Sequence, residues 1–263
     1  MPDIVGNIRV DQAWGSAQVM GALHNVRATY YHGGSTDTAD NQTAHPKDKW
    51  GHAFGGGITL KMPWDPKDTV SGMVTYCKGA VRYCSNPAGG ILGSGRMFGL
   101  VNENKIGVGW ADDAYFDGTV IGSGLELSKA WSAVAAFEHY WTPTLRSSIY
   151  GSYFKYEANS STVDIVCANP NGQPGGATGI LGGNNAPFGP GCADWSAWQI
   201  GTRTIWNPVA NLDIGLDIMY TKVNTAFQGG TFSTTSQGLN RNLVLDDTHV
   251  WSGILRIQRN FWP

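Results

Sequence analysis

Apolar and polar residues alternate along most of the chain, with the two-residue period that places successive side chains on opposite faces of a β-strand. In the clearest stretch, Leu212, Ile214 and Leu216 share one face, whereas Asp213 and Asp217 share the other. The alternation predicts nine strands, at residues 4–11, 16–31, 48–62, 68–83, 125–140, 144–157, 194–206, 211–223 and 246–262. The fold is therefore expected to be all-β, and the apolar runs fall far short of the ~20 residues that a transmembrane helix requires.

The connections between these strands alternate strictly between short and long. The short ones are 11–15, 63–68, 141–144 and 206–211, and the long, polar, Gly-rich ones are 32–47, 84–124, 158–193 and 224–245. A barrel inserted from one side of a membrane has this order of tight periplasmic turns and long external loops. The pattern predicts that residues 1–263 form a single region of an antiparallel transmembrane β-barrel.

Each short connection carries a tryptophan, and a further one ends the last strand. An indole ring prefers the membrane–water interface because its body is apolar and its N–H needs a partner. The predicted aromatic girdle is Trp14, Trp64, Trp141, Trp206 and Trp262. A second girdle is expected at the opposite strand ends, with Tyr30, Tyr31, Trp50, Tyr83, Tyr153 and Trp195. Trp131 and Trp141 are separated by about 25 Å at ~3.3 Å per residue and ~40° tilt, close to the apolar band of a barrel.

If the apolar face meets lipid, the polar face lines a water-filled lumen. Strand parity predicts these pore-lining residues: Arg9, Lys49, Lys61, Glu138, Arg146, Arg203, Asp213, Asp217 and Arg256. Such charges orient dipolar solutes without a binding site for any one molecule, although each residue taken singly is equally consistent with a solvated side chain. Lys129 and His52 share the parity of the apolar face, which indicates either a position at the external rim or a β-bulge.

Composition narrows the classes of partner and the redox compartment. Charged residues make up 14% of the chain, the net charge is −2, and no basic cluster is present, so nucleic acid is not an expected partner. Cys167 and Cys192 flank one long connection, which suggests a disulfide in an oxidising compartment. Cys77 and Cys84 lie on one predicted strand, about 23 Å apart if it is extended. They can bond only if that strand ends early, because a disulfide needs Cα atoms within about 7 Å.

No stretch carries the spacing of a catalytic, cofactor-binding or metal-binding motif. The Gly93–Gly99 stretch lacks the dinucleotide-binding pattern, and the six histidines are scattered. The pairs Asp112–Asp113 and Asp246–Asp247 are more typical of solvated loops than of calcium ligands. The sequence therefore predicts no enzyme activity, no cofactor and no metal site.

The stretch Pro2–Val19 with Gly21–His24, the segment Leu127–Arg146 and the end Arg256–Trp262 together resemble the porins of alphaproteobacteria, of the rhizobial and Brucella type. The resemblance implies a homotrimeric, sixteen-stranded general-diffusion porin. Such a protein is embedded in the lipids of the bacterial outer membrane and passes small hydrophilic solutes and ions.

The resemblance further implies that this chain matches the carboxy-terminal half of such a porin. The signal peptide, the first seven strands and the loop that folds inward to narrow the pore are then expected to lie outside it. Nine is an odd number of strands, whereas single-chain bacterial barrels have even counts. An isolated chain would leave unpaired strand edges, which hydrocarbon does not tolerate, so it is expected to aggregate or to require detergent.

Two alternatives come from other functional classes. One is a soluble β-sandwich carbohydrate-binding protein whose aromatic side chains stack on sugars, and the other is an outer-membrane enzyme or adhesin built on a barrel. The arrangement of aromatic residues discriminates between barrel and sandwich. Rings gathered at two levels favour a barrel, whereas a single surface row favours a sugar-binding sandwich.

Overall fold

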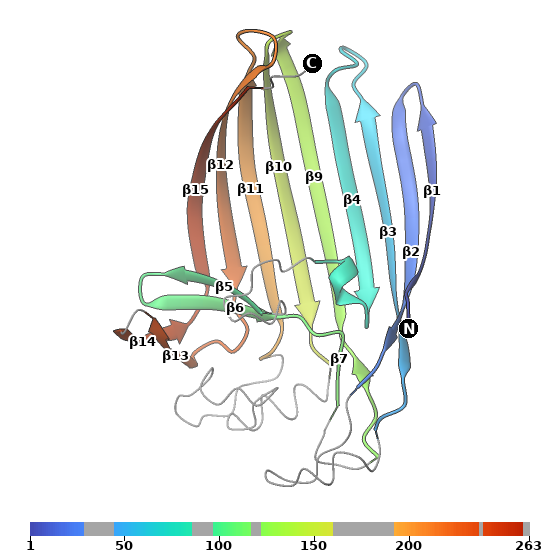
Figure 1. Cartoon of the computed structure of the whole chain (residues 1–263), viewed down its shortest axis with the longest axis vertical. Coiled ribbons are helices and arrows are strands. Elements are labelled where there is room, and N and C mark those ends of the chain that lie inside the picture. The colour runs from blue at the N-terminus through green and yellow to red at the C-terminus, as the bar shows by residue number, and fades with distance from the viewer. Residues whose placement is uncertain (29–44, 86–96, 117–121, 160–191, 237–238, 260–263) are drawn as a thin grey trace.

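The computed structural model describes residues 1–28, 45–85, 97–116, 122–159, 192–236 and 239–259 (Figure 1). Nine long strands form one sheet: β1 (Ile4–Gln12), β2 (Gly15–Val26), β3 (Lys49–Lys61), β4 (Thr69–Lys78), β9 (Lys129–Thr142), β10 (Leu145–Glu157), β11 (Trp195–Trp206), β12 (Leu212–Asn224) and β15 (Thr248–Arg259). They confirm the nine predicted strands. The predicted ranges 16–31 and 68–83 are too long, because β2 ends at Val26 and β4 ends at Lys78.

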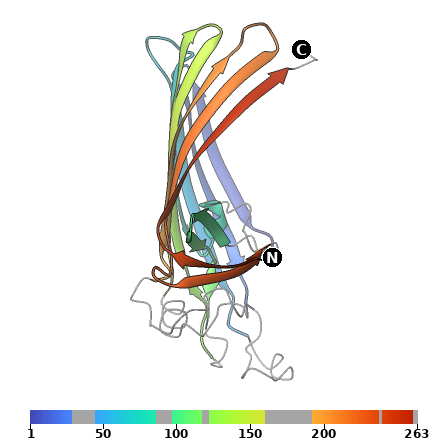
Figure 2. The same ribbon diagram turned by 90° about the vertical axis from the view of Figure 1, so that its left-hand side faces the viewer.

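Neighbouring strands in the sheet follow one another in the chain, and every neighbouring pair is antiparallel. All four short connections consequently lie at one end of the sheet, and the strand ends that lead into the long connections lie at the other (Figure 1). Figure 2 shows that the sheet is curved. Within the described residues β1 and β15 are its two free edges. The fold is therefore a curved antiparallel wall.

A second, smaller sheet forms where the sequence predicts only loops. It contains β5 (Met97–Asn102), β6 (Lys105–Trp110), β13 (Thr231–Ser236) and β14 (Leu239–Leu245), in the order β13-β14-β6-β5. The strands β7 (Ala114–Tyr115) and β8 (Glu126–Leu127) form a further short pair. The interpretation of 84–124 and 224–245 as purely irregular is therefore wrong. These strands are short, and β5 and β6 carry glycine, so the two-residue period is too brief to stand out.

The register divides the side chains of the large sheet into two faces, because Cα partners in adjacent strands point the same way. On the apolar face, large hydrophobic side chains are exposed, as at Ile8 (70%), Val74 (57%) and Leu255 (68%). A soluble domain rarely exposes so continuous an apolar surface. The polar face carries the charged residues that are considered below.

A disulfide joins Cys77 to Cys84, with the Cα atoms 6.1 Å apart. The strand ends early enough to allow it, because Gly79 adopts a left-handed conformation (φ +65°) and the chain then turns into the 3₁₀ helix η2 (Val81–Tyr83). Cys192 is also disulfide-bonded. Its predicted partner Cys167 lies outside the described residues, so the Cys167–Cys192 pair stays a prediction.

Candidate functional site

The polar face brings together the charged residues that strand parity selected. In one row of Cα partners, Glu138 is followed by Ser148, Arg203 and Asp217 across β9, β10, β11 and β12. The remaining registers carry the same face to both edges of the sheet. All nine predicted residues lie on it: Arg9, Lys49, Lys61, Glu138, Arg146, Arg203, Asp213, Asp217 and Arg256.

Arg203 and Asp217 form the most complete pair on this face. The Arg203 guanidinium donates to Asp217 Oδ2 at 2.8 Å, and the Tyr150 hydroxyl donates to the other oxygen of the same carboxylate. The guanidinium also lies over the Tyr150 ring, 5.9 Å from its centroid. With Arg256 and Asp213 this pair lines a hollow of about 230 Å³. Opposite charges thus neighbour each other on one wall and create a local dipole at its surface.

Two further arginines on the face lie close to carboxylates. Arg146 Nε lies 3.8 Å from Glu138 Oε2, and Arg9 donates to Asp11 at 2.8 Å. Asp11 was not among the predicted pore-lining residues, although its parity is that of Arg9 and identifies it. Basic residues outnumber acidic ones among these residues of the face, six to four when Asp11 is included.

The half of the polar face nearest the long connections is covered by the chain itself. Residues 79–85 and 97–116, here called the cross-wall segment, fold back over it. The Tyr156 hydroxyl donates to the carbonyl of Asp112 at 3.2 Å, and Trp195 Nε1 donates to the carbonyl of Trp110 at 2.8 Å. At the far edge Thr248 donates to the carbonyl of Leu100 at 3.0 Å. The segment therefore crosses the wall from β4 to β15.

Two glycines let β6 lie directly on the wall. A Cβ atom added at Gly107 would come within 2.4 Å of Thr248 Oγ1, and one added at Gly109 within 2.2 Å of the Trp195 ring. The neighbouring Ile106 is 2% exposed. The contact is thus a small apolar core on an otherwise polar face. This chain therefore has an inward-packed segment of its own, whereas the position of the constriction loop that the resemblance places outside the chain stays a prediction.

The same contact corrects part of the predicted second girdle. Trp195 is 5% exposed beneath the cross-wall segment, and the Tyr83 hydroxyl donates to Asp3 at 2.6 Å from η2. Neither residue belongs to the apolar face, because Trp195 has the parity of Arg203. Tyr30 and Tyr31 lie outside the described residues. Trp50 and Tyr153 lie on the apolar face, as predicted.

The aromatic residues of the apolar face lie at two levels. At the short-turn end Trp14, Trp64, Trp141 and Trp206 are all exposed, whereas Trp262 lies outside the described residues. Near the opposite end is a row of Tyr76, Trp131, Tyr153, Trp198, Tyr220 and Trp251. Within this row the Trp131 and Tyr153 rings are in contact, with centroids 4.9 Å apart, and the Tyr220 ring contacts those of Trp198 and Trp251. Strand parity carries this signal, but the sequence analysis did not use it for four of the six.

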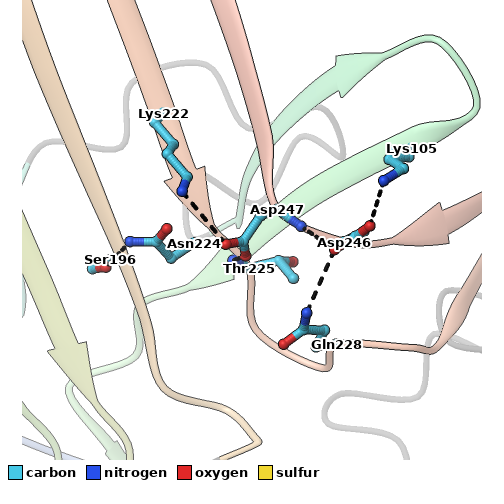
Figure 3. Close-up of polar contacts among 8 residues, drawn as sticks. All are labelled: Lys105, Ser196, Lys222, Asn224, Thr225, Gln228, Asp246 and Asp247. Atoms are coloured by element: carbon cyan, nitrogen blue, oxygen red, sulfur yellow. Dashed lines mark hydrogen bonds and ion pairs between the residues drawn. The ribbon is translucent and has the colours of Figure 1, made fainter.

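A polar network fastens the small sheet to the wall (Figure 3). Lys105 Nζ lies 2.6 Å from Asp246 Oδ2, and Lys222 lies 3.8 Å from Asp247. The Lys105 ammonium holds the pKa of Asp246 below its ordinary value, and Asp246 in turn raises the pKa of Lys105. The two aspartates therefore serve as anchors for β6 and β12. No group of three or more His, Cys, Asp or Glu side chains suited to a metal ion occurs in the described part of the chain.

Acid is expected to loosen the β5–β6 hairpin from the wall. Because the folded-state pKa of Asp246 is lowered, its contribution to docking is complete above pH 3.8 and is lost as pH falls through that lowered pKa. Asp246→Asn should reproduce the acid state at pH 7, and amides of residues 97–110 should exchange with deuterium faster. Asp65→Asn, in a turn at the other end of the sheet, is the control. Unchanged exchange in Asp246→Asn would contradict the anchoring role.

Comparison with known proteins places these surfaces in context. A family model described as a porin subfamily matches residues 1–254. The crystal structure of the outer membrane channel DcaP of Acinetobacter baumannii is similar, with a TM-score of 0.51 and 13% sequence identity over 97% of this chain and 52% of that chain. At this identity the similarity concerns the fold alone, and the chain spans about half the length of the channel. No curated protein matches the chain, and no helix among the described residues is long and apolar enough to cross a membrane.

Proposed function

The chain belongs to the porin subfamily that its residues 1–254 match, and from this premise we propose that it forms part of the wall of a water-filled channel in the bacterial outer membrane. Small hydrophilic solutes and ions diffuse passively through this channel, without a cofactor and without covalent chemistry. One observation carries the proposal. The nine charged residues predicted to line the pore share one face of a curved antiparallel sheet, whose other face exposes large apolar side chains.

We further propose that the whole channel is a sixteen-stranded homotrimer of the alphaproteobacterial type, of which this chain supplies the carboxy-terminal half. The nine-stranded order and the 52% coverage of the solved channel support this division. The free edges of β1 and β15 support it as well, since backbone N–H and C=O groups in hydrocarbon require partners. Further strands of the same protein would supply those partners.

A soluble carbohydrate-binding sandwich fits the wall less well. In a sandwich the apolar face of one sheet packs on a second sheet, whereas here Ile8, Val74 and Leu255 are exposed on that face. The small sheet packs on the polar face instead. The aromatic residues lie at two levels of the apolar face, as interface girdles do.

Charge reversal on the polar face tests the proposal. The test variant of the full-length protein combines Arg146→Glu, Arg203→Glu and Arg256→Glu. Its cation-to-anion permeability ratio, obtained from the reversal potential in planar bilayers, should rise severalfold because the wall then attracts cations. Lys129→Glu is the matched control, since its side chain lies on the apolar face and should leave selectivity unchanged. If the triple variant keeps the wild-type selectivity, the polar face does not line the pore.

A further inference from the structure

Two lysines lie opposite each other on the apolar face of the sheet, away from the charged residues of the polar face. Lys78 and Lys129 are Cα partners of β4 and β9, at the end of these strands nearest the long connections. The β4–β9 register runs without interruption from this pair to Thr69 and Glu138, so the parity of Lys129 does not arise from a bulge in this pairing. Like charges directly opposite each other destabilise a sheet. An anion bound between the two ammonium groups would remove this repulsion.

Neighbouring lysines at the same rim already have acidic partners. Lys155 Nζ donates to Glu157 at 2.8 Å, and Lys222 lies 3.8 Å from Asp247. Glu157 is the Cα partner of Lys129 on β10, but its carboxylate is bonded to Lys155. Three lysines, Lys78, Lys129 and Lys155, therefore lie beside this one carboxylate, and the group keeps a net positive charge. An anion that neutralises them must come from the surroundings of the apolar face.

The height of the lysine pair in the sheet is that of lipid headgroups. One step nearer the middle of the same strands, Tyr76 and Trp131 are partners, and Trp131 contacts Tyr153. Aromatic rings of this kind mark the edge of the hydrocarbon. Two residues farther along a tilted strand is about 5 Å along the membrane normal. The ammonium groups therefore reach the level of the headgroup phosphates.

Below the aromatic row the same strands carry a hollow lined by small residues. Gly72, Ala135 and Gly151 are successive Cα partners across β4, β9 and β10, and with Gly56 they line a depression of about 770 Å³. Gly72 lies six residues from Lys78. This separation is about 15 Å along the membrane normal, half of the ~30 Å hydrocarbon core. An acyl chain that starts at the lysines would end in the hollow.

We propose that the outward face of β4 and β9 binds one phosphorylated, acylated lipid of the outer leaflet. Its phosphate lies between Lys78 and Lys129, and one acyl chain runs past Val74 into the hollow at Gly72. The proposal rests on the proposed function, because it requires the apolar face to meet lipid and the long connections to lie outside the cell. It adds a specific lipid site to a surface that otherwise meets only bulk hydrocarbon.

Native mass spectrometry of the porin, purified from outer membranes in mild detergent and delipidated, tests the site with bis-phosphorylated lipid A as the probe. Lys78→Gln with Lys129→Gln should weaken binding about 30-fold, since each lysine near an anionic surface contributes about 1 kcal/mol. Dephosphorylated lipid A should bind the wild type more weakly than bis-phosphorylated lipid A does, by the same factor. Lys222→Gln, a lysine that already has an acidic partner, should change binding by less than about twofold.

A second variant tests the hollow. At Gly72 an added Cβ would lie 3.6 Å from the nearest atom, the Val134 carbonyl oxygen, so Gly72→Leu fills the hollow without displacing the backbone. It should weaken lipid binding and leave the oligomeric state unchanged. Equal binding by the wild type and the double lysine variant would overturn the proposal, as would dissociation of oligomers by Gly72→Leu in lipid-free detergent. Loss of lipid binding with unchanged conductance would support the site, whereas a wild type that binds lipid without conducting would contradict the proposed function alone.

Discussion

Replacing β5 and β6 (residues 97–110) with a short Gly-Ser linker should raise the single-channel conductance of the full-length porin by about twofold or more. The hairpin belongs to a four-stranded sheet that stands on the polar face near the long connections (Figure 2). Strands about 4.8 Å apart make this sheet about 14 Å wide between its outer strands. The deletion removes two of the four strands and so opens about 10 Å of this width to ions, which conductance in planar bilayers measures directly.

The deletion also uncovers apolar side chains, so a milder variant serves as its partner. Gly109→Val places a Cβ against the Trp195 ring, 2.2 Å from its nearest atom, and should push β6 off the wall while the nine-stranded sheet persists. Conductance should rise in the same direction, by less than in the deletion. Heat-modifiable migration on gels reports whether the barrel is intact. Wild-type conductance in both variants, with the barrel intact, would mean that the hairpin does not narrow the channel.

The wall was predictable from sequence because one physical constraint repeats in each of its strands. A strand alternates wherever its two faces meet different surroundings, and β12 does so from Leu212 to Ile218. Parity alone then places Arg9 and Arg256 on one face, although they lie on the two edge strands of the sheet. Parity needs no knowledge of which residues are partners, and this is why the nine charges were found together.

The cross-wall segment was not predictable in the same way. Its position depends on long-range contacts, such as Gly109 against Trp195 and Leu100 with Thr248, that no local period encodes. One signal was nevertheless present. Near the long connections the polar face carries Ala53 and Val223, which are apolar and buried. Apolar residues on a face assigned to water indicate that something covers them.

The partners on the polar face were also beyond the sequence. Parity puts Arg203 and Asp217 on one side of their strands, but only the register makes them Cα partners. A shift of the register by two residues would keep every face and change every pair. The residues that face the water are therefore a sequence-level result, whereas the dipoles they form require the structure.

The two faces of β4 can be compared at adjacent positions. Val74 lies on the apolar face and is 57% exposed, whereas Met73 lies on the polar face and is 39% exposed. Val74→Arg should destabilise the assembled barrel by about 2–4 kcal/mol, the cost of an arginine on the lipid face near the bilayer midplane. Measured as the urea midpoint of folding into lipid vesicles, this loss should be accompanied by less protein in the outer membrane.

Met73→Arg is the matched control for that substitution. It adds the same side chain one residue away, where water solvates the guanidinium, so stability should change by less than about 1 kcal/mol. The added charge should also increase anion selectivity in planar bilayers, an effect that Val74→Arg should not show. Because the two positions are adjacent on one strand and at nearly the same depth, a difference between the two variants reports the effect of the face alone. Equal destabilisation by both arginines would mean that both faces of β4 are in equivalent surroundings, which is incompatible with a channel wall.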